Sequence, residues 1–474
     1  MAQGIHKKAD GQKGSFWNFI DNIEGDKVVW IIVFILTMIS ALAIFSSTSQ
    51  LTGDTTDRID LIKQHALVII GGYALIFLLY NVKKIGWFRF LSKFGFLLTF
   101  ILLLILDTRA NLGFIKAQYI NKAWRTLSLF GLQIHVFEVA KVAMVMYLAW
   151  ALHAYRKDQE DISAHKKSST YTIANLLAQT KTFAFMAKPF WKRAFYMYLP
   201  MVIVCAMILP GSNSSAIFIG GIMLATLMIG GVPFKEIFLG LVIAAGLFAG
   251  ALGLHLASDG NVFGRMGTLI KRVQADYSIE RLVEIENDRT KGKYSKEWFD
   301  VRDEIKQPYT ARIAVHEGGF IGKGSGNSTQ KYVVTHIYSD YMYSFIIEEY
   351  GMAGGILVLI LFVSLLARGS MIARLCTNEY AKIVVGGLSL LITGQAFMHI
   401  FVNVGIGPMT GQTLPLISDG SFAFLMFCAA FGVILSISRI ARNQIREEEE
   451  AAAPLYESNK DDIQVAMDVL EQLD

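Results

Sequence analysis

The sequence has few charged residues and few cysteines for its length, and both shortages limit what the chain can be. Asp, Glu, Lys and Arg make up 18% of its 474 residues, whereas a soluble domain averages about 25%. Its three cysteines, Cys205, Cys376 and Cys428, lie in or beside apolar runs without CxxC or Cys–His spacing. A disulfide framework or a zinc site is therefore not expected, and these residues should pack as small apolar side chains.

The sequence also lacks a polybasic run with interleaved aromatic residues, the pattern expected of nucleic-acid binding. Its net charge of +5 comes largely from Lys and Arg that flank apolar segments, where such residues anchor and orient membrane helices. Residues 1–27 are mostly polar, so no cleavable signal sequence is evident. We expect no nucleic-acid partner and a cytoplasmic N-terminal segment over residues 1–27.

Long apolar runs are what the sequence has in abundance, with 53% hydrophobic residues. A run of about 20 apolar residues spans the hydrocarbon core of a bilayer. The runs therefore predict an all-α, polytopic membrane protein with about ten transmembrane helices. Their approximate positions are 28–47, 65–82, 92–107, 134–153, 195–210, 213–231, 236–257, 343–367, 382–404 and 421–438.

The connections between these runs alternate in charge. Residues 81–93 carry four bases and no acid, and residues 154–193 carry eight bases against three acids. Because positive connections face the cytoplasm, an even number of spans places both termini there and the long connection, about 258–340, on the outer side. That connection is too long for a plain linker and is expected to be a functional loop.

Two further segments stand outside regular helices in the sequence pattern. The connection 405–420 is rich in Gly, Pro and Thr, and non-helical backbone near a membrane must line a cavity or be buried in protein. Residues 443–474 include four consecutive glutamates and are expected to form a disordered, acidic cytoplasmic tail. The transmembrane domain is thus predicted to cover residues 28–442.

Glu138 and Lys141 lie inside the fourth apolar run, where ionisable residues are costly. Three residues apart, they share one face of a helix and can pair. They either form a structural ion pair or face a functional cavity, and position alone favours neither. Arg125, just before this run, either snorkels at the interface or holds a phosphate group. The scattered histidines have no ligand spacing, so a histidine metal site is not predicted.

Three blocks occur in a characteristic order. WRTLSLFGLQIHVFEVAK contains Arg125, Glu138 and Lys141; GKGSGNSTQ, SDY and EEYG follow; and GIGPMTGQTLPLIS comes near the end. In this order they resemble the SEDS family of polytopic glycosyltransferases that includes FtsW and RodA, over about residues 28–442. The GNS-x-Q form and GQTLPLIS look more like the division member FtsW than the elongation member RodA.

The resemblance implies a peptidoglycan glycosyltransferase that polymerises lipid II, an undecaprenyl-pyrophosphate-linked disaccharide-peptide, into glycan strands. It implies a multi-pass protein of the bacterial cytoplasmic (inner) membrane at the division septum. Expected partners are membrane lipid, a class B penicillin-binding protein with transpeptidase activity, and other division proteins. A divalent cation, Mg²⁺ or Mn²⁺, is compatible with the resemblance, but the sequence contains no recognisable site for one.

The family's proposed catalytic base is an aspartate in the outer loop, seven residues before a glutamine. Counting back from Gln307 reaches Asp300; the surrounding glycines and proline of the family block are absent, so Asp303 remains a rival. The expected reaction is an inverting single displacement, for which one carboxylate base suffices. The resemblance places these further residues at the substrate: Arg125, Glu138, Lys141, Gln307, Asn327, Ser328, Gln330, Asp340, Pro415 and Ser418.

Some positions depart from the family pattern. Gly211 stands where the family has an acidic residue, His399 stands where it often has Asn, and Asp419 adds a carboxylate after Ser418. The departures keep open a non-catalytic scaffold for the transpeptidase. A lipid II flippase is a third possibility, because the same cavity and buried charges would serve transport.

Overall fold

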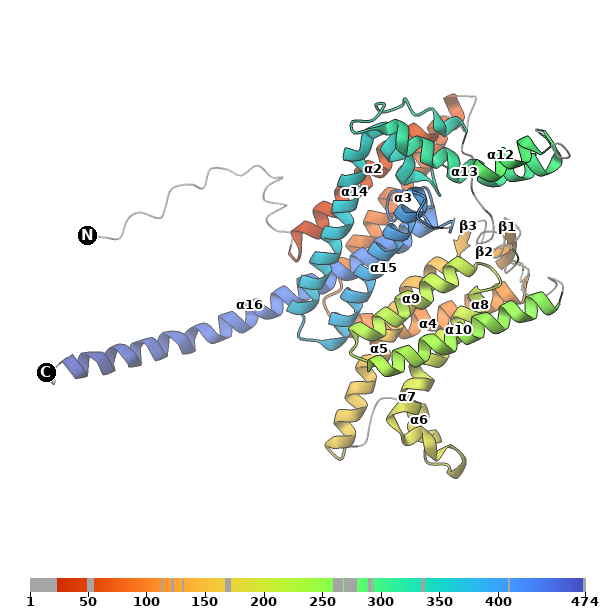
Figure 1. Ribbon diagram of the computed structural model, residues 1–474. Coiled ribbons are helices and arrows are strands. Elements are labelled where there is room, and N and C mark those ends of the chain that lie inside the picture. Colours follow the sequence, from red (N-terminus) through yellow and green to blue (C-terminus); the bar gives the residue numbers. More distant parts are fainter. Residues whose placement is uncertain are drawn as a thin grey trace, which may run out of the picture.

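The computed structural model (Figure 1) describes residues 24–48, 55–111, 113, 115–120, 123–129, 132–166, 172–258, 267, 279–288, 292, 294–333, 337–407 and 410–471. The side chain of Asp303, the rival base, lies outside this description, although its backbone is part of a helix. Most of the N-terminal segment 1–27 also lies outside it.

The chain is predominantly helical, and within the described residues nine helical segments are long and apolar enough to cross a membrane. The shorter apolar helix α9, Asn213–Ile229, supplies a tenth, which confirms the prediction of about ten transmembrane helices. The others are α2 (Lys27–Ser47), α3 (Thr55–Tyr80), α4 (Ile85–Asp107), α5 (Val136–Ser163), the continuous run α7–η3–α8 (Pro189–Ile208), α10 (Phe234–Ala257), α14 (Met342–Leu375), α15 (Glu379–Asn403) and α16 (Ser421–Glu471).

A short three-stranded antiparallel sheet, which the sequence analysis did not predict, precedes α5 in this predominantly helical chain. Its strands, β1 (Ile115–Ile120), β2 (Ala123–Leu129) and β3 (Leu132–His135), pair in chain order. In β1, Ile115, Ala117 and Tyr119 alternate with polar residues, which is the two-residue period of a strand. The segment lies between two long apolar runs and contains strand signals too short to stand out from a connection.

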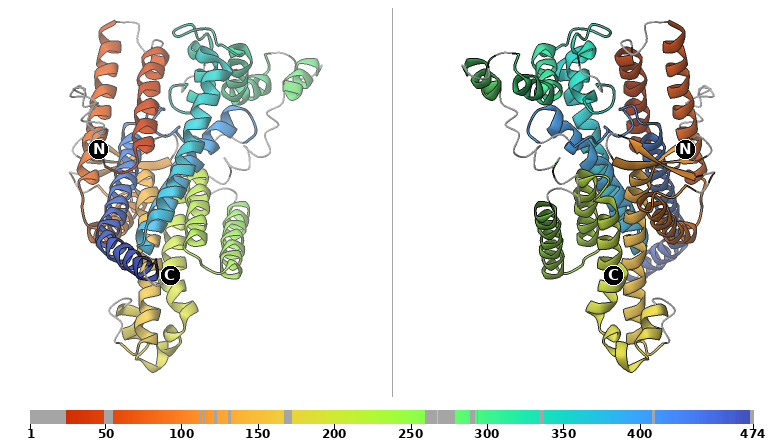
Figure 2. Two further views of the ribbon diagram at one scale, coloured as in Figure 1. Left: turned by 90° about the vertical axis from the view of Figure 1, so that its left-hand side faces the viewer. Right: turned by 90° about the vertical axis from the view of Figure 1, so that its right-hand side faces the viewer.

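Helices α5 and α15 run through the middle of the bundle. Both are mostly buried, and they pack on one another and on α9. Helices α3 and α10 are largely exposed, and Figure 2 shows α10 set apart at the side of the bundle. One hydrophobic core joins the central helices with α2, α14 and α16. Polar residues on α5 and α15 are therefore held at the centre of the molecule.

The connections divide between two ends of the bundle. One end, called here the strand end, carries β1–β3, the α10–α14 connection and the α15–α16 connection; the other, the basic end, carries the α3–α4, α5–α8 and α14–α15 connections (Figures 1 and 2). Ion pairs join helices at the basic end. Lys192 lies 2.6 Å from Asp158 with both side chains buried, and Asp26, which caps α2, binds Arg368.

The long α10–α14 connection contains two helices of its own. Helix α12 (Ile279–Asn287) and the start of α13 (Lys296–Gly318) pack through Ile285, Trp298 and Val301, a small cluster separate from the main core. The other end of α13 packs on α14 and reaches the α15–α16 connection, where Arg312 donates to the carbonyl oxygen of Gly405 at 3.2 Å. The connection is thus a helical hairpin attached to the bundle at one end.

Helix α14 is interrupted near the strand end. Gly351 has φ 72° and ψ −178°, a region that is essentially restricted to glycine. Segment 319–324 supplies backbone partners at the break: Met352 donates to Gly319 and Gly324 donates to Glu349, each at 2.9 Å. Non-helical backbone at membrane depth is tolerated where protein satisfies its polar groups in this way.

Helix α16 continues through the acidic tail as far as Glu471 and extends away from the bundle in Figure 1. For residues 443–474 the sequence predicted a disordered tail, whereas the structure describes residues 443–471 as helical. Ala, Glu and Lys are good helix formers, and a helix that continues from a packed segment needs no new nucleation.

Candidate functional site

Lys141 lies at the centre of a buried polar cluster, called here the Lys141 cluster: Glu138, Lys141, Ser215, Gln395 and Gln412. Its Nζ donates to Glu138 Oε1 at 2.6 Å, to Gln395 Oε1 at 2.8 Å and to Gln412 Oε1 at 2.8 Å. The Gln412 amide donates in turn to Ser215 Oγ at 3.0 Å. The side chain of Lys141 is 1% exposed and that of Glu138 17% exposed, so Glu138 is the member that reaches the edge of the cluster.

Four elements hold this cluster together. Glu138 and Lys141 lie one turn apart on α5, and Gln395 lies on α15 at the same level, with its amide donating to the Thr413 carbonyl at 2.9 Å. Ser212 caps α9 and hydrogen-bonds Ser215. The cluster therefore forms only when α5, α9, α15 and the α15–α16 connection pack together.

The face of α15 that carries Gln395 also carries His399 and Asn403, spaced four residues apart. His399 Nδ1 hydrogen-bonds the Gln412 main-chain oxygen at 2.8 Å, and Asn403 donates to the Asp340 main-chain oxygen at 3.1 Å. Since i and i+4 residues share a helix face, this stripe fastens two connections to α15. The departure from the family at His399 thus has a structural role.

The α15–α16 connection folds back on itself beside the cluster. Pro415 and Ser418 are buried, and the Ser418 hydroxyl accepts from Leu414 N at 2.9 Å and donates to the Ser339 carbonyl at 2.8 Å. Asp419 follows directly, and burial raises the pKa of its carboxyl. This connection therefore places Pro415, Ser418 and a carboxylate on the segment that carries Gln412.

Arg125 lies on β2 and reaches the turn before α9, where its Nε donates to the Gly211 carbonyl at 3.0 Å. A Cβ on Gly211 would lie 2.7 Å from the Trp124 carbonyl oxygen and 2.5 Å from the Phe137 ring. This close approach excludes the acidic side chain that the family pattern carries at this position. Arg125 is connected to the Lys141 cluster through this turn and Ser215.

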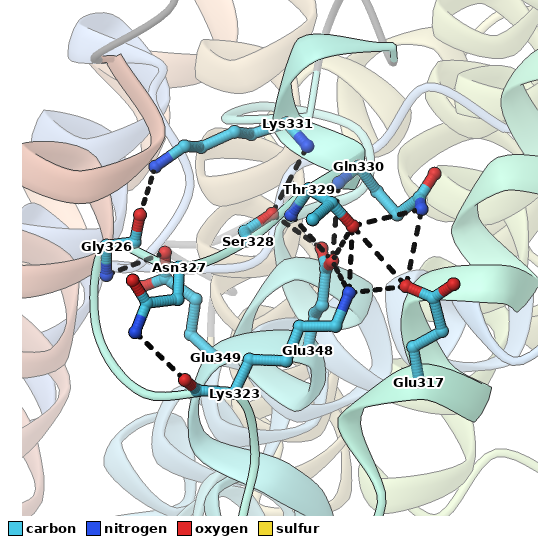
Figure 3. A network of polar contacts seen from close by, with 10 residues as sticks. All are labelled: Glu317, Lys323, Gly326, Asn327, Ser328, Thr329, Gln330, Lys331, Glu348 and Glu349. Carbon is cyan, nitrogen blue, oxygen red and sulfur yellow. Dashed lines mark hydrogen bonds and ion pairs between the residues drawn. The ribbon is translucent and has the colours of Figure 1, made fainter.

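A second polar group, called here the Glu348 cluster, lies where loop 319–331 meets α14: Glu317, Lys323, Ser328, Thr329, Gln330 and Glu348 (Figure 3). Glu348 is fully buried, and Lys323 Nζ and Ser328 Oγ donate to it at 2.8 and 2.5 Å. The backbone N–H groups of Thr329 and Gln330 also donate to Glu348. Asn327 instead donates to the Lys323 carbonyl at 3.0 Å.

Two charged groups fasten the outer part of this cluster. Lys323 also pairs with Glu317 at the end of α13, and the hydrogen bond from Lys323 lowers the pKa of the Glu317 carboxyl. Beside them, the buried Glu349 accepts from Ser46 Oγ at 2.5 Å and from Gly326 N at 3.0 Å. Asn327, Ser328 and Gln330 are therefore surrounded by groups that anchor the loop, at a place distinct from the Lys141 cluster.

Asp300 is not brought together with either cluster. It is exposed on α13, and within the described part of the chain no hydrogen bond or ion pair joins it to Arg125 or Lys141. At 1.5 Å per residue, it lies about 18 Å along the helix from Arg312, where α13 meets the α15–α16 connection. Gln307 is half-buried on the same helix. A role for Asp300 at Lys141 therefore requires the hairpin to move.

Metal ligands are not clustered in the described residues, where no group of three or more His, Cys, Asp or Glu side chains could hold an ion. The divalent cation stays a prediction. Sequence reasoning missed Ser215, Gln395 and Gln412 as members of the Lys141 cluster. Their one signal was polarity inside or beside apolar runs, which also occurs in ordinary helix contacts.

Comparisons with known proteins show the family to which the chain is similar. A family model described as "Cell cycle protein", FTSW_RODA_SPOVE, matches residues 26–443. A probable peptidoglycan glycosyltransferase FtsW of Pseudomonas fluorescens is 26% identical over 373 residues, covering 77% of this chain and 75% of that protein. Stage V sporulation protein E of Bacillus subtilis is 26% identical over 419 residues, covering 88% of this chain and 98% of that protein.

Solved structures share the fold. A chain from a structure described as "Structural coordination of polymerization and crosslinking by a peptidoglycan synthase complex" has a TM-score of 0.57 at 20% identity, covering 88% of this chain and 98% of that one. The rod shape determining protein RodA of Thermus thermophilus has a TM-score of 0.50 at 19% identity, with the same two coverages.

Proposed function

Because this chain belongs to the cell cycle protein family of FtsW, RodA and SpoVE, we propose that it is a membrane-embedded peptidoglycan glycosyltransferase that polymerises lipid II. Relatives named as peptidoglycan glycosyltransferases support this proposal. The observation in the structure that carries it is the buried cation at Lys141, one turn from Glu138 and connected through Gly211 and Ser215 to Arg125.

The chemistry needs positive charge at this place. Lipid II joins its sugar to the prenyl chain through a diphosphate, which leaves as an anion when the sugar is transferred. Preorganised cations in a water-poor site stabilise such developing charge. Lys141 and Arg125 would supply these cations, and Glu138 would orient Lys141. The prenyl chains would lie in lipid beside the helices.

The base of the reaction is proposed to be Asp300. It would take the proton of the acceptor's 4-hydroxyl as that oxygen bonds to C1 of the donor sugar and the bond from C1 to the diphosphate breaks. One displacement inverts the anomeric carbon, so a second carboxylate is not required. Asp300 is exposed on the attached hairpin, and this role requires the hairpin to bring it to a substrate held at the Lys141 cluster.

The relatives support a proposal for partners and location. One solved relative comes from a peptidoglycan synthase complex, and we propose a class B penicillin-binding protein as the partner of this chain. The relatives named FtsW favour a role at the division septum over cell-wall elongation. The basic connections favour a cytoplasmic basic end and an outer strand end, where the acceptor strand would grow.

The test is lipid II polymerisation by the purified full-length protein, with and without a class B penicillin-binding protein, read as glycan bands on a gel. Asp300→Asn is expected to reduce the rate by about 10²-fold or more, the contribution of a general base. Asp303→Asn and Asp419→Asn test the other carboxylates. Glu297→Gln, on the same helix as Asp300, is the matched control and should polymerise normally.

Each alternative has its own result. A folded Asp300→Asn protein that polymerises at the normal rate removes Asp300 from the mechanism, and loss in another variant moves the base there. Wild-type protein that forms no glycan but moves lipid II across liposome membranes would be a flippase. Protein that does neither, yet co-purifies with the transpeptidase, would be a scaffold.

A further inference from the structure

Lys141 has no free hydrogen-bond donor. An ammonium group carries three N–H donors, and those of Lys141 are directed to the oxygens of Glu138, Gln395 and Gln412 at 2.6–2.8 Å. The Phe218 ring centroid lies 5.8 Å from Nζ, and the side chain is 1% exposed. An anion can therefore reach this ammonium only if one of the three acceptors leaves.

The three acceptors are not held equally. Glu138 lies on α5 itself and carries the opposite charge, and Gln395 lies within the buried helix α15, with its amide bound to Thr413. Gln412 is neutral and lies on the non-helical α15–α16 connection, next to Gly411, whose φ is 65°. Losing this acceptor breaks no charge pair, and its backbone, unlike that of Gln395, lies outside the helices.

A hydrogen bond from His399 fixes the backbone of Gln412, whereas its side chain has few hydrogen-bond partners. His399 binds the main-chain oxygen of Gln412 at 2.8 Å, so the residue remains beside the cluster whatever its side chain does. Apart from Lys141, the side-chain amide contacts Ser215 Oγ at 3.0 Å. Rotation of this one side chain would release a donor of Lys141 without disturbing the fold.

We propose that Gln412 is a positioning residue: its side chain caps Lys141 in the empty site and is displaced by the diphosphate of the lipid-linked substrate. The proposal deepens and rests on the proposed function. The cap keeps the buried cation satisfied between turnovers, because an unpaired buried charge is costly. It also weakens substrate binding by the hydrogen bond that must first be broken.

Binding of inorganic pyrophosphate to the full-length protein in detergent, measured by calorimetry, tests this directly. Gln412→Leu removes the acceptor at similar volume and should lower the Kd by roughly tenfold, the order expected for a hydrogen bond to a charged group. Gln412→Glu places a second carboxylate on the cation and should raise the Kd by at least about tenfold. Gln133→Leu makes the same change on exposed β3 and should leave the Kd unaltered.

The pH dependence of pyrophosphate binding distinguishes the cap from a merely structural role. The weak binding of the Gln412→Glu protein should recover as the pH falls toward the ordinary range of a carboxyl pKa, about 4.3, because protonation restores a neutral side chain. With lipid II as substrate, the KM should follow the order of the Kd values while kcat does not rise in Gln412→Leu.

An unchanged or higher Kd in folded Gln412→Leu protein would overturn the proposal, as would normal pyrophosphate binding by Lys141→Met. If Gln412→Leu does not fold, Gln412→Met removes the same acceptor with an unbranched chain. If the Kd values follow the expected order but no glycan forms, the cap is supported and the polymerase activity is refuted. If glycan forms but the Kd values do not follow that order, the polymerase activity is supported and the cap is refuted.

Discussion

At the scale of single residues, the two polar clusters each surround a buried charge with a dense group of partners. Lys141 has Glu138 and two glutamine oxygens, and Glu348 has Lys323 with hydroxyl and backbone donors. Removing one member should therefore cost more than removing the whole pair, because the remaining charge is left buried.

Glu138→Gln is expected to destabilise the protein by a few kcal/mol, toward the lower end of the roughly 3–5 kcal/mol seen when a buried pair is broken, since Glu138 is partly exposed. The double variant Glu138→Leu/Lys141→Met should lose less stability than the two single changes added together. Thermal unfolding in detergent measures this. Strictly additive losses would mean that the two charges do not interact in the native state.

The Glu317–Lys323 contact predicts a response to acid at the strand end. The hydrogen bond from Lys323 holds the pKa of Glu317 below its ordinary value, so this contact stabilises the loop above the unfolded pKa of about 4.3. The stabilisation is lost as the pH falls through the lower, folded value. Hydrogen exchange of residues 319–331, corrected for intrinsic rates, should accelerate below that range. Glu317→Gln should exchange faster already at neutral pH and show a smaller step, because Glu348 still binds the loop.

Residue-scale prediction from the sequence was limited by distance along the chain. The Glu138–Lys141 pair followed from a spacing of three residues, and the structure contains it. Gln395 and Gln412 lie 254 and 271 residues from Lys141, so no local pattern connects them to it. Ser215 could not be predicted for the same reason, because its helix reaches the cluster only when the bundle packs.

At the scale of elements, the break in α14 joins the outer hairpin to the bundle. The hydrogen bonds that the helix loses at Gly351 are replaced by segment 319–324, and Glu348 and Glu349 fasten loop 326–331 alongside. The helix and the loop therefore behave as one structural unit. The position of α13, and with it Asp300, depends on this unit.

Gly351→Ala should be strongly destabilising. A Cβ at this position would lie 2.2 Å from the Phe320 carbonyl oxygen, and the backbone conformation itself costs a residue with a side chain about 1–3 kcal/mol. Gly221→Ala is the matched control, because this helical glycine has open space around it. The thermal unfolding temperature and the polymerisation rate should both fall in Gly351→Ala and not in Gly221→Ala. Equal behaviour of the two variants would contradict the packing at the break.

Element prediction succeeded where the signal was long and failed where it was short. Ten apolar runs became ten helices, because burial in lipid demands length. The strands β1–β3 were missed, since four to seven residues of alternation are weak beside such runs. The α14 break was also missed: glycine is common in membrane helices, and nothing local marks the one whose conformation is left-handed.

At the scale of the whole molecule, the two ends of the bundle differ in charge and in structure. The basic end carries the lysine- and arginine-rich connections, and the strand end carries the sheet and the hairpin. Each polar cluster includes a residue of a strand-end connection, Gln412 in one and Lys323 in the other. If the basic end is cytoplasmic, both clusters lie toward the opposite side of the membrane, where the glycan is proposed to grow.

Single-cysteine labelling checks this orientation. In a background with the three native cysteines replaced by alanine, Lys181→Cys on η2 (Lys181–Ala187) and Lys296→Cys at the start of α13 are both exposed. A membrane-impermeant maleimide is applied to cells whose outer envelope lets the reagent pass and whose cytoplasmic membrane is intact. It should label Lys296→Cys only. Labelling of Lys181→Cys under these conditions would invert the topology.

The break at Gly351 has a consequence for how the protein is made. Synthesis runs from the N-terminus, so residues 319–324 leave the ribosome before α14 does and, with the strand end on the proposed outer side, would cross the membrane first. When α14 then enters the bilayer with unpaired backbone N–H and C=O groups at Gly351, the segment that hydrogen-bonds them would already lie at the strand end. A circular permutant that delivers α14 first would have to insert a helix with unmet polar backbone, and its yield in the membrane should fall accordingly.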